Sequence, residues 1–135
     1  MKKPDFYCVL LVDDDEVSLF ISQTILLRHK LADHTHTALN GDAALRFLQD
    51  QLIPDHPEPH KPNLIFLDID MPVLDGFGFL DAYDRLIFPG KDAVRIVMLT
   101  SSSNPKDLEK AHQHGISEVI SKPLTQEKVL HLTEG

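Results

Sequence analysis

The sequence has little cysteine, little positive charge and no long apolar run, and each shortage restricts the class of protein. Its single cysteine, Cys8, allows no disulfide within the chain, which suits a reducing compartment. Lys and Arg number 13 against 21 Asp and Glu, and the net charge of -8 disfavours nucleic acid or an anionic membrane as a partner. The apolar run at residues 6–12 is too short for a membrane span or a signal-peptide core. We therefore expect a cytoplasmic protein that binds neither nucleic acid nor membrane.

The length and apolar content suit one compact domain. With 135 residues, of which 42% are hydrophobic, the chain can fill a single core. We place this domain at residues 5–133. Residues 50–63 contain four prolines, which block both a helix interior and a central strand, so this segment is predicted to be an extended surface loop. No output domain is expected in the chain.

The apolar pattern alternates between strand and helix signals along the chain. Short apolar runs, and one weakly alternating edge segment, predict strands at residues 7–12, 34–38, 64–67, 95–99 and 118–121. Helical spacing follows each strand, at residues 17–30, 43–48, 77–86, 105–114 and 125–132. In the first of these helices Val17, Phe20, Ile21, Thr24 and Ile25 recur at helical spacing. Five such β/α units predict an α/β fold with a mostly parallel sheet and helices on both faces.

Acidic, hydroxyl and basic residues follow the ends of the predicted strands. They are Asp13, Asp14, Asp68, Thr100, Ser101 and Lys122. In an open parallel sheet, ligands bind where the carboxyl ends of the strands meet. Three carboxylates in contact repel one another unless a cation or a proton compensates them, and Mg²⁺ prefers such oxygen ligands. A hydroxyl and an ammonium group would complete a site for a phosphoryl group.

This set of residues resembles the receiver domain of bacterial response regulators. The resemblance spans the whole chain and rests on four motifs in order, which are Val12-Asp13-Asp14, Asp68-Ile69-Asp70-Met71-Pro72 with Asp75-Gly76, Thr100-Ser101, and Lys122-Pro123. It implies a flavodoxin-like, doubly wound fold with a five-stranded parallel sheet in the order 2-1-3-4-5. It also implies a stand-alone receiver in a two-component phosphorelay, which signals by altered protein binding.

The resemblance assigns the acidic residues to phosphoryl transfer and metal binding. Asp68 would accept a phosphoryl group from a sensor histidine kinase in a Mg²⁺-dependent reaction. Asp13, Asp14, Asp68 and the main-chain carbonyl of Asp70 would hold the Mg²⁺ ion. A histidine phosphotransfer protein and a downstream target protein are the other implied partners. The chain is then no enzyme beyond its own phosphorylation and dephosphorylation.

The remaining motifs are assigned to phosphoryl binding and to the conformational response. Thr100 and Ser101 would bind the phosphoryl group, Lys122 would pair with Asp68 or the phosphoryl oxygens, and Pro123 would follow a cis peptide bond. Receivers usually carry Tyr or Phe three residues before this lysine, and this chain has Val119 there. An aromatic rotamer switch is therefore missing or relocated.

Two questions stay open at this point. The Asp70 side chain would border the phosphoryl group, where it would either repel that group or orient the hydrolytic water. The segment from Leu64 to Asp70 also resembles the strand and Asp-x-Asp motif of haloacid-dehalogenase-like phosphatases and phosphotransferases, with Asp70 as general acid. In that alternative Pro72 departs from the motif and the Asp13-Asp14 pair has no explanation.

Overall fold

The computed structural model describes residues 6–51, 62–71, 73–88, 91–101, 105–116 and 118–134. Its five strands form one sheet in the order β2-β1-β3-β4-β5, and all four pairings are parallel. The strands are β1 (Phe6–Val12), β2 (Ala32–Ala38), β3 (Leu64–Asp68), β4 (Arg95–Thr100) and β5 (Val119–Ser121). The predicted doubly wound α/β fold and its strand order are confirmed.

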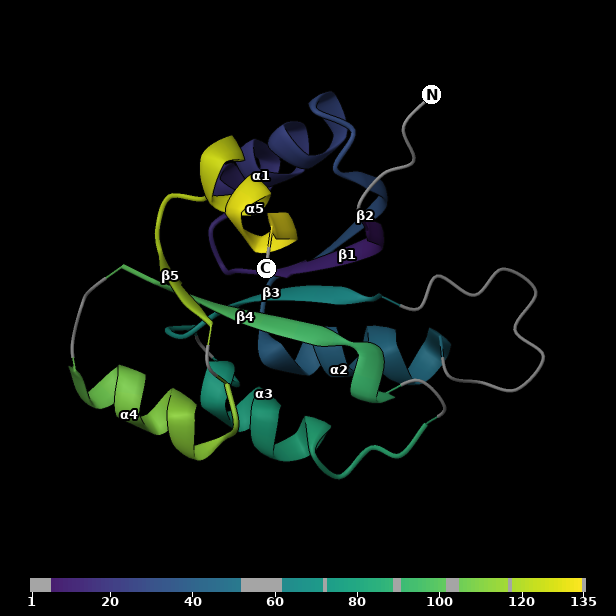
Figure 1. The fold of residues 1–135 in the computed structure, drawn as a ribbon. Coiled ribbons are helices and arrows are strands. Elements are labelled where there is room, and N and C mark those ends of the chain that lie inside the picture. The colour runs from purple at the N-terminus through teal and green to yellow at the C-terminus, as the bar shows by residue number, and fades with distance from the viewer. Residues whose placement is uncertain are drawn as a thin grey trace.

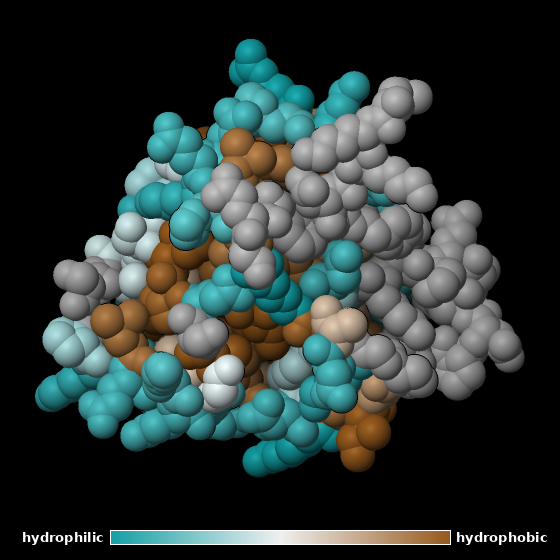
Figure 2. Space-filling view, viewed as in Figure 1, coloured by the Kyte–Doolittle hydropathy of each residue, from teal (hydrophilic) through white to brown (hydrophobic). Residues whose placement is uncertain are grey.

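Helices cover both faces of this sheet. They are α1 (Glu16–Arg28), α2 (Gly41–Gln51), α3 (Gly76–Tyr83), α4 (Pro105–Gln113) and α5 (Gln126–Glu134), with a short 3-10 helix η1 (Lys91–Ala93) before β4. Figure 1 shows α1 and α5 on one side of the sheet and α2, α3 and α4 on the other. Apolar residues show between the two helical layers (Figure 2). Among the described residues, no helix is both long and apolar enough to span a bilayer.

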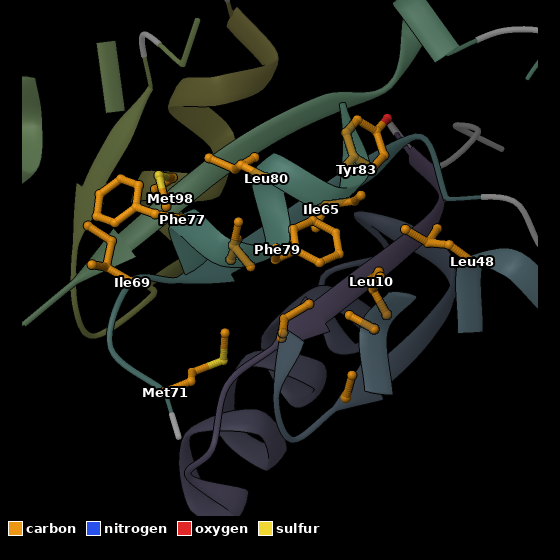
Figure 3. Close-up of a cluster of buried hydrophobic side chains, with 14 of the residues drawn as sticks. Leu10, Leu48, Ile65, Ile69, Met71, Phe77, Phe79, Leu80, Tyr83 and Met98 are labelled. Atoms are coloured by element: carbon orange, nitrogen blue, oxygen red, sulfur yellow. The ribbon is translucent and has the colours of Figure 1, made fainter. Parts of the chain in front are cut away.

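The core consists of two apolar clusters, one on each face of the sheet. Successive residues of a strand point to opposite faces. In β1, Leu10 therefore packs into the cluster under α2 and α3, where Phe79 is fully buried (Figure 3). Its neighbour Leu11 belongs to the cluster under α1 and α5, together with Leu26. Burial on both faces explains why β1 reads as a continuous apolar run.

The predicted first helix is present as α1, but Val17 and Phe20 do not lie on the side that meets the sheet. Val17 is 66% exposed and Phe20 is 69% exposed, whereas Leu19, Ser22 and Leu26 are buried. Apolar residues lie on both sides of this helix, so their spacing predicts a helix but does not choose which side meets the sheet.

The third helix ends about one turn earlier than its apolar pattern predicted. α3 ends at Tyr83, although Leu86 continues the helical spacing. The Lys91 ammonium group donates hydrogen bonds to the main-chain oxygens of Tyr83 (3.0 Å) and Asp84 (3.2 Å), and it also contacts the Leu86 oxygen. The Tyr83 oxygen also accepts from the Leu86 amide at 2.9 Å, so the chain after α3 is held in a turn rather than in a further helical turn. The predicted proline-rich loop at 50–63 lies largely outside the described residues, and α2 continues to Gln51.

The two sides of α1 are expected to respond differently to truncation. Leu26→Ala should lower the free energy of unfolding by about 2–4 kcal/mol, because it leaves a cavity in the core. Phe20→Ala removes an exposed ring and should change it by less than about 0.5 kcal/mol. Urea denaturation followed by circular dichroism measures both values. A larger loss for Phe20→Ala would contradict the orientation of α1.

Candidate functional site

The topology of the sheet places two buried carboxylates side by side. β1 and β3 are neighbours although many residues separate them in sequence, and Val12 pairs with Leu67. The residues that follow this pair, Asp13 and Asp68, therefore lie at the same edge, and each is only 4% exposed. The chain leaves β1 toward β2 and leaves β3 toward β4, so this edge is a topological switch point, where ligands bind in such sheets.

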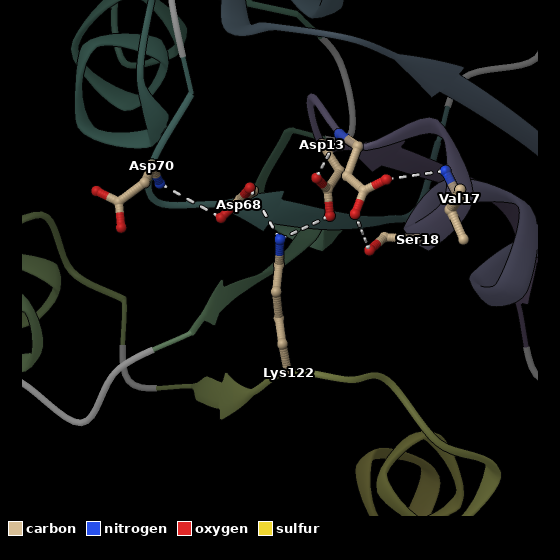
Figure 4. A network of polar contacts seen from close by, with 7 residues as sticks. Asp13, Val17, Ser18, Asp68, Asp70 and Lys122 are labelled. Carbon is tan, nitrogen blue, oxygen red and sulfur yellow. Dashed lines mark hydrogen bonds and ion pairs between the residues drawn. The ribbon is translucent and has the colours of Figure 1, made fainter.

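Lys122 joins the two carboxylates. It follows β5 at the outer edge of the sheet, and its Nζ atom lies 2.8 Å from Asp13 Oδ2 and 3.0 Å from Asp68 Oδ2 (Figure 4). The Lys122 amide donates to the Thr100 carbonyl oxygen at 2.8 Å, which extends the β4–β5 pairing by one residue. The peptide bond between Lys122 and Pro123 is cis. The contact of Lys122 with Asp13 had not been foreseen from the sequence.

The electrostatics of this group leave its negative charge only partly compensated. Burial raises the pKa of Asp68, the hydrogen bond and charge of Lys122 lower it, and the charge of Asp13 raises it, with a net rise to about 6. Burial alone would lower the pKa of Lys122, but its hydrogen bonds to Asp13 and Asp68 outweigh burial and raise it. One ammonium group thus faces two carboxylates, with the exposed Asp14 beside them.

The same carboxylates fit a magnesium ion. Asp13, Asp14 and Asp68 each offer an oxygen within 4.8 Å of the others. The Asp15 amide donates to Asp13 Oδ1 at 2.9 Å and the Asp70 amide to Asp68 Oδ1 at 3.3 Å, so the backbone orients two of these carboxylates. Mg²⁺ prefers hard oxygen donors and keeps several of its water molecules when bound. A set of carboxylates of which one, Asp14, is exposed to water is therefore typical of a Mg²⁺ site.

The hydroxyl residues lie at the same edge, whereas the Asp70 carboxylate lies outside the cluster. Asp68 pairs with Leu99, so Thr100 is one position beyond it on the neighbouring strand, and Thr100 is buried while Ser101 is exposed. Asp70 is exposed, and Figure 4 shows its carboxylate directed away from Asp13 and Lys122.

The loop after β3 contains two features that the sequence analysis missed. A Cβ atom at Gly76 would lie 2.6 Å from the main-chain oxygen of Asp68, so only glycine lets α3 begin this close to the acidic cluster. Val73 has φ 72° and is 82% exposed, and this conformation strains a β-branched residue. The Asp75-Gly76 motif indicates the close approach at Gly76, but no sequence pattern indicates the positive φ of Val73.

The comparisons with known proteins agree with this geometry. The family described as the response regulator receiver domain matches residues 9–134. A two-component response regulator from Cytophaga hutchinsonii has a similar structure, with a TM-score of 0.80, 26% identity and coverage of 98% of both chains. The bacteriophytochrome response regulator AtBRR has a TM-score of 0.71 and 28% identity, covering 97% of this chain and 91% of its own. The chain belongs to the response regulator receiver domain family.

Relatives by sequence include both longer and similarly sized proteins. The two-component response regulator ARR10 of Arabidopsis thaliana is 32% identical over 92% of this chain, which spans only 20% of that protein. A probable chemotaxis protein CheY of Rhizobium etli is 29% identical over 90% of this chain and 84% of its own length. The haloacid-dehalogenase alternative is not supported, because the family that matches residues 9–134 is the response regulator receiver domain.

Asp68→Asn is expected to stabilise the metal-free protein at pH 7 by roughly 1–2 kcal/mol, because it removes a buried carboxylate with a raised pKa. The pKa of Asp68 is about 6 in the folded protein, against an ordinary value of 3.8. Ionisation of Asp68 therefore lowers the free energy of unfolding in full above pH 6 and not at all below pH 3.8. The advantage of the variant should therefore shrink as the pH falls through this window. Urea denaturation in EDTA across this range measures it.

The matched control is Asp33→Asn, which removes an exposed carboxylate from β2. This control should show no comparable gain at pH 7. An Asp68→Asn variant less stable than the wild type at pH 7 would contradict the electrostatic description of the site.

Proposed function

We propose that this chain is a phosphorylation-controlled receiver, whose Asp68 accepts a phosphoryl group from a sensor histidine kinase in a Mg²⁺-dependent reaction. The observation that carries the proposal is the buried Asp68 carboxylate, hydrogen-bonded by Lys122 and clustered with Asp13 and Asp14 at the switch point of the sheet. The family match over residues 9–134 supports it.

In the transfer, a carboxylate oxygen of Asp68 attacks the phosphorus atom of a phosphohistidine. The new O–P bond forms as the N–P bond breaks, and the electron pair of the broken bond returns to the imidazole ring. Lys122 favours the ionised, nucleophilic form of Asp68 and supplies positive charge beside the phosphoryl oxygens. A Mg²⁺ ion held by Asp13, Asp14, Asp68 and the main-chain carbonyl of Asp70 would neutralise charge that develops on these oxygens.

Phosphorylation would change the balance of charge around Lys122. Asp68 exchanges a carboxylate charge for a phosphoryl group, which attracts the ammonium group now shared with Asp13. Thr100 and Ser101 are the proposed donors to the phosphoryl oxygens. Because α4 starts a few residues beyond them, a shift of Thr100 acts on this helix.

We propose that the conformational change on phosphorylation involves α4 rather than Val119. Ala111 is the buried residue of α4, so little apolar surface holds this helix in place. Val119 is half-buried and packs beside the cluster under α2 and α3, and its β-branched side chain has few rotamers. The receiver domain at residues 5–133 would thus present a changed α4 surface to a target protein. Return of the group to the kinase, or its passage to a histidine phosphotransfer protein, uses the same Asp68.

Incubation with acetyl phosphate and Mg²⁺ is expected to add one phosphoryl group, because Asp68 and its cation site need no protein donor for the chemistry. Intact mass spectrometry measures the addition, which EDTA and Asp68→Asn should each abolish. Asp33→Asn, which lies on β2, should still be phosphorylated. An unchanged mass increase in Asp68→Asn would show that the acceptor is another residue.

Binding of beryllofluoride, which mimics a phosphoryl group, is expected to shift amide resonances most strongly between Thr100 and Leu108. Smaller shifts are expected around Val119, because valine has no ring to move between water and core. Heteronuclear NMR of the Mg²⁺-loaded protein with and without beryllofluoride measures both regions. The largest shifts at Val119 and α5, with Ser101 unchanged, would exclude this route.

A further inference from the structure

The outward side of α1 carries an apolar stripe that the described part of the chain does not cover. Val17 is 66% exposed, Phe20 69%, Ile21 47% and Leu27 47%. With the exposed Thr24 between them, these five residues follow helical spacing along one side of α1, and we call them the α1 stripe. Contiguous exposed apolar surface of this kind marks a contact site in a soluble domain.

The two ends of α1 carry opposite charges. Asp14, Asp15 and Glu16 lie at its N-terminal end, and Arg28, His29 and Lys30 lie at or just after its C-terminal end. Within the described residues, no ion pair engages Glu16, Arg28 or Lys30. The helix thus presents an acidic end, an apolar middle and a basic end to solvent.

We propose that the α1 stripe is a self-association surface, on which a second copy of this chain docks by the same stripe with its α1 antiparallel. In a twofold pair the acidic end of each helix meets the basic end of the other, and the two helix dipoles point in opposite directions. Phe20 of one copy then lies against Ile21 and Thr24 of the second copy. A second copy supplies complementary charge at both ends and a matching apolar middle.

The size of the surface sets the strength of this association. α1 has 13 residues and is therefore about 20 Å long. Two such helices bury less than the roughly 1,200 Å² that stable complexes need, so the pair is expected to be weak and reversible.

The position of the stripe links pairing to access at the acidic cluster. The amide of Asp15, the N-cap of α1, donates to the Asp13 carboxylate, so α1 begins at the cluster. In the antiparallel pair, Arg28 and Lys30 of the second copy lie beside Asp14 and Glu16. A protein that approaches the cluster along α1 therefore competes with the second copy. The self-association itself does not depend on the proposed function.

Sedimentation velocity of the unphosphorylated full chain in EDTA tests the proposal over a range of concentrations. We expect reversible dimers, which Phe20→Glu should abolish and Arg28→Glu should weaken by about threefold or more in dissociation constant. The variant that combines Glu16→Lys with Arg28→Glu should restore dimers, because both contacts are then reversed together. Ile87→Glu, which changes an aliphatic residue that is 96% exposed outside the stripe, is the matched control and should leave the dimer intact.

Thermal unfolding by circular dichroism establishes that each variant folds. A folded wild-type chain that stays monomeric up to roughly 1 mM would overturn the proposal. Dimers that persist in Phe20→Glu, or that the charge-exchanged variant fails to restore, would overturn it as well. A monomeric chain whose stripe instead binds a helical phosphodonor would assign the surface to that partner and refute self-association.

Discussion

The arrangement of this molecule depends on one ammonium group held between two buried carboxylates. Burial of Asp13 and Asp68 without a counter-charge would cost several kcal/mol. Lys122 supplies that charge from the far edge of the sheet, at 2.8 and 3.0 Å. The contact requires the ends of β1, β3 and β5 to meet at one edge, and the strand order β2-β1-β3-β4-β5 brings them there. The fold therefore brings together charged side chains that lie far apart in the sequence.

The compensation of charge at this site is incomplete. One ammonium group faces two carboxylates and the nearby Asp14, so the cluster retains negative charge that attracts a cation. Burial raises the pKa of Asp68 while Lys122 opposes the rise. The close approach of α3 at Gly76 then fixes the backbone of Asp68 beside its partners.

Sequence patterns predicted the features that depend on local periodicity or on strand ends. β1 and residues 64–67 of β3 are apolar because both their faces are buried, and the acidic residues come directly after these runs, Asp13 after β1 and Asp68 as the last residue of β3. The patterns failed where a distant segment decides the outcome. α3 ends at Tyr83, where Lys91, from a later segment, donates to the main-chain oxygens of Tyr83 and Asp84. The contact between Lys122 and Asp13 likewise depends on a side chain that reaches across the sheet.

The side of α1 that packs on the sheet could not be chosen from the apolar spacing alone. A helix that is apolar on both sides buries only one side against a single sheet, so the other stays in water. Asp15 caps this helix, because it accepts bonds from the Val17 amide and the Ser18 hydroxyl while its own amide donates to Asp13. Asp15 therefore connects the start of α1 to the acidic cluster. In the proposed pair, the second copy on the stripe therefore lies beside the acidic cluster, because α1 begins at Asp15, whose amide donates to Asp13.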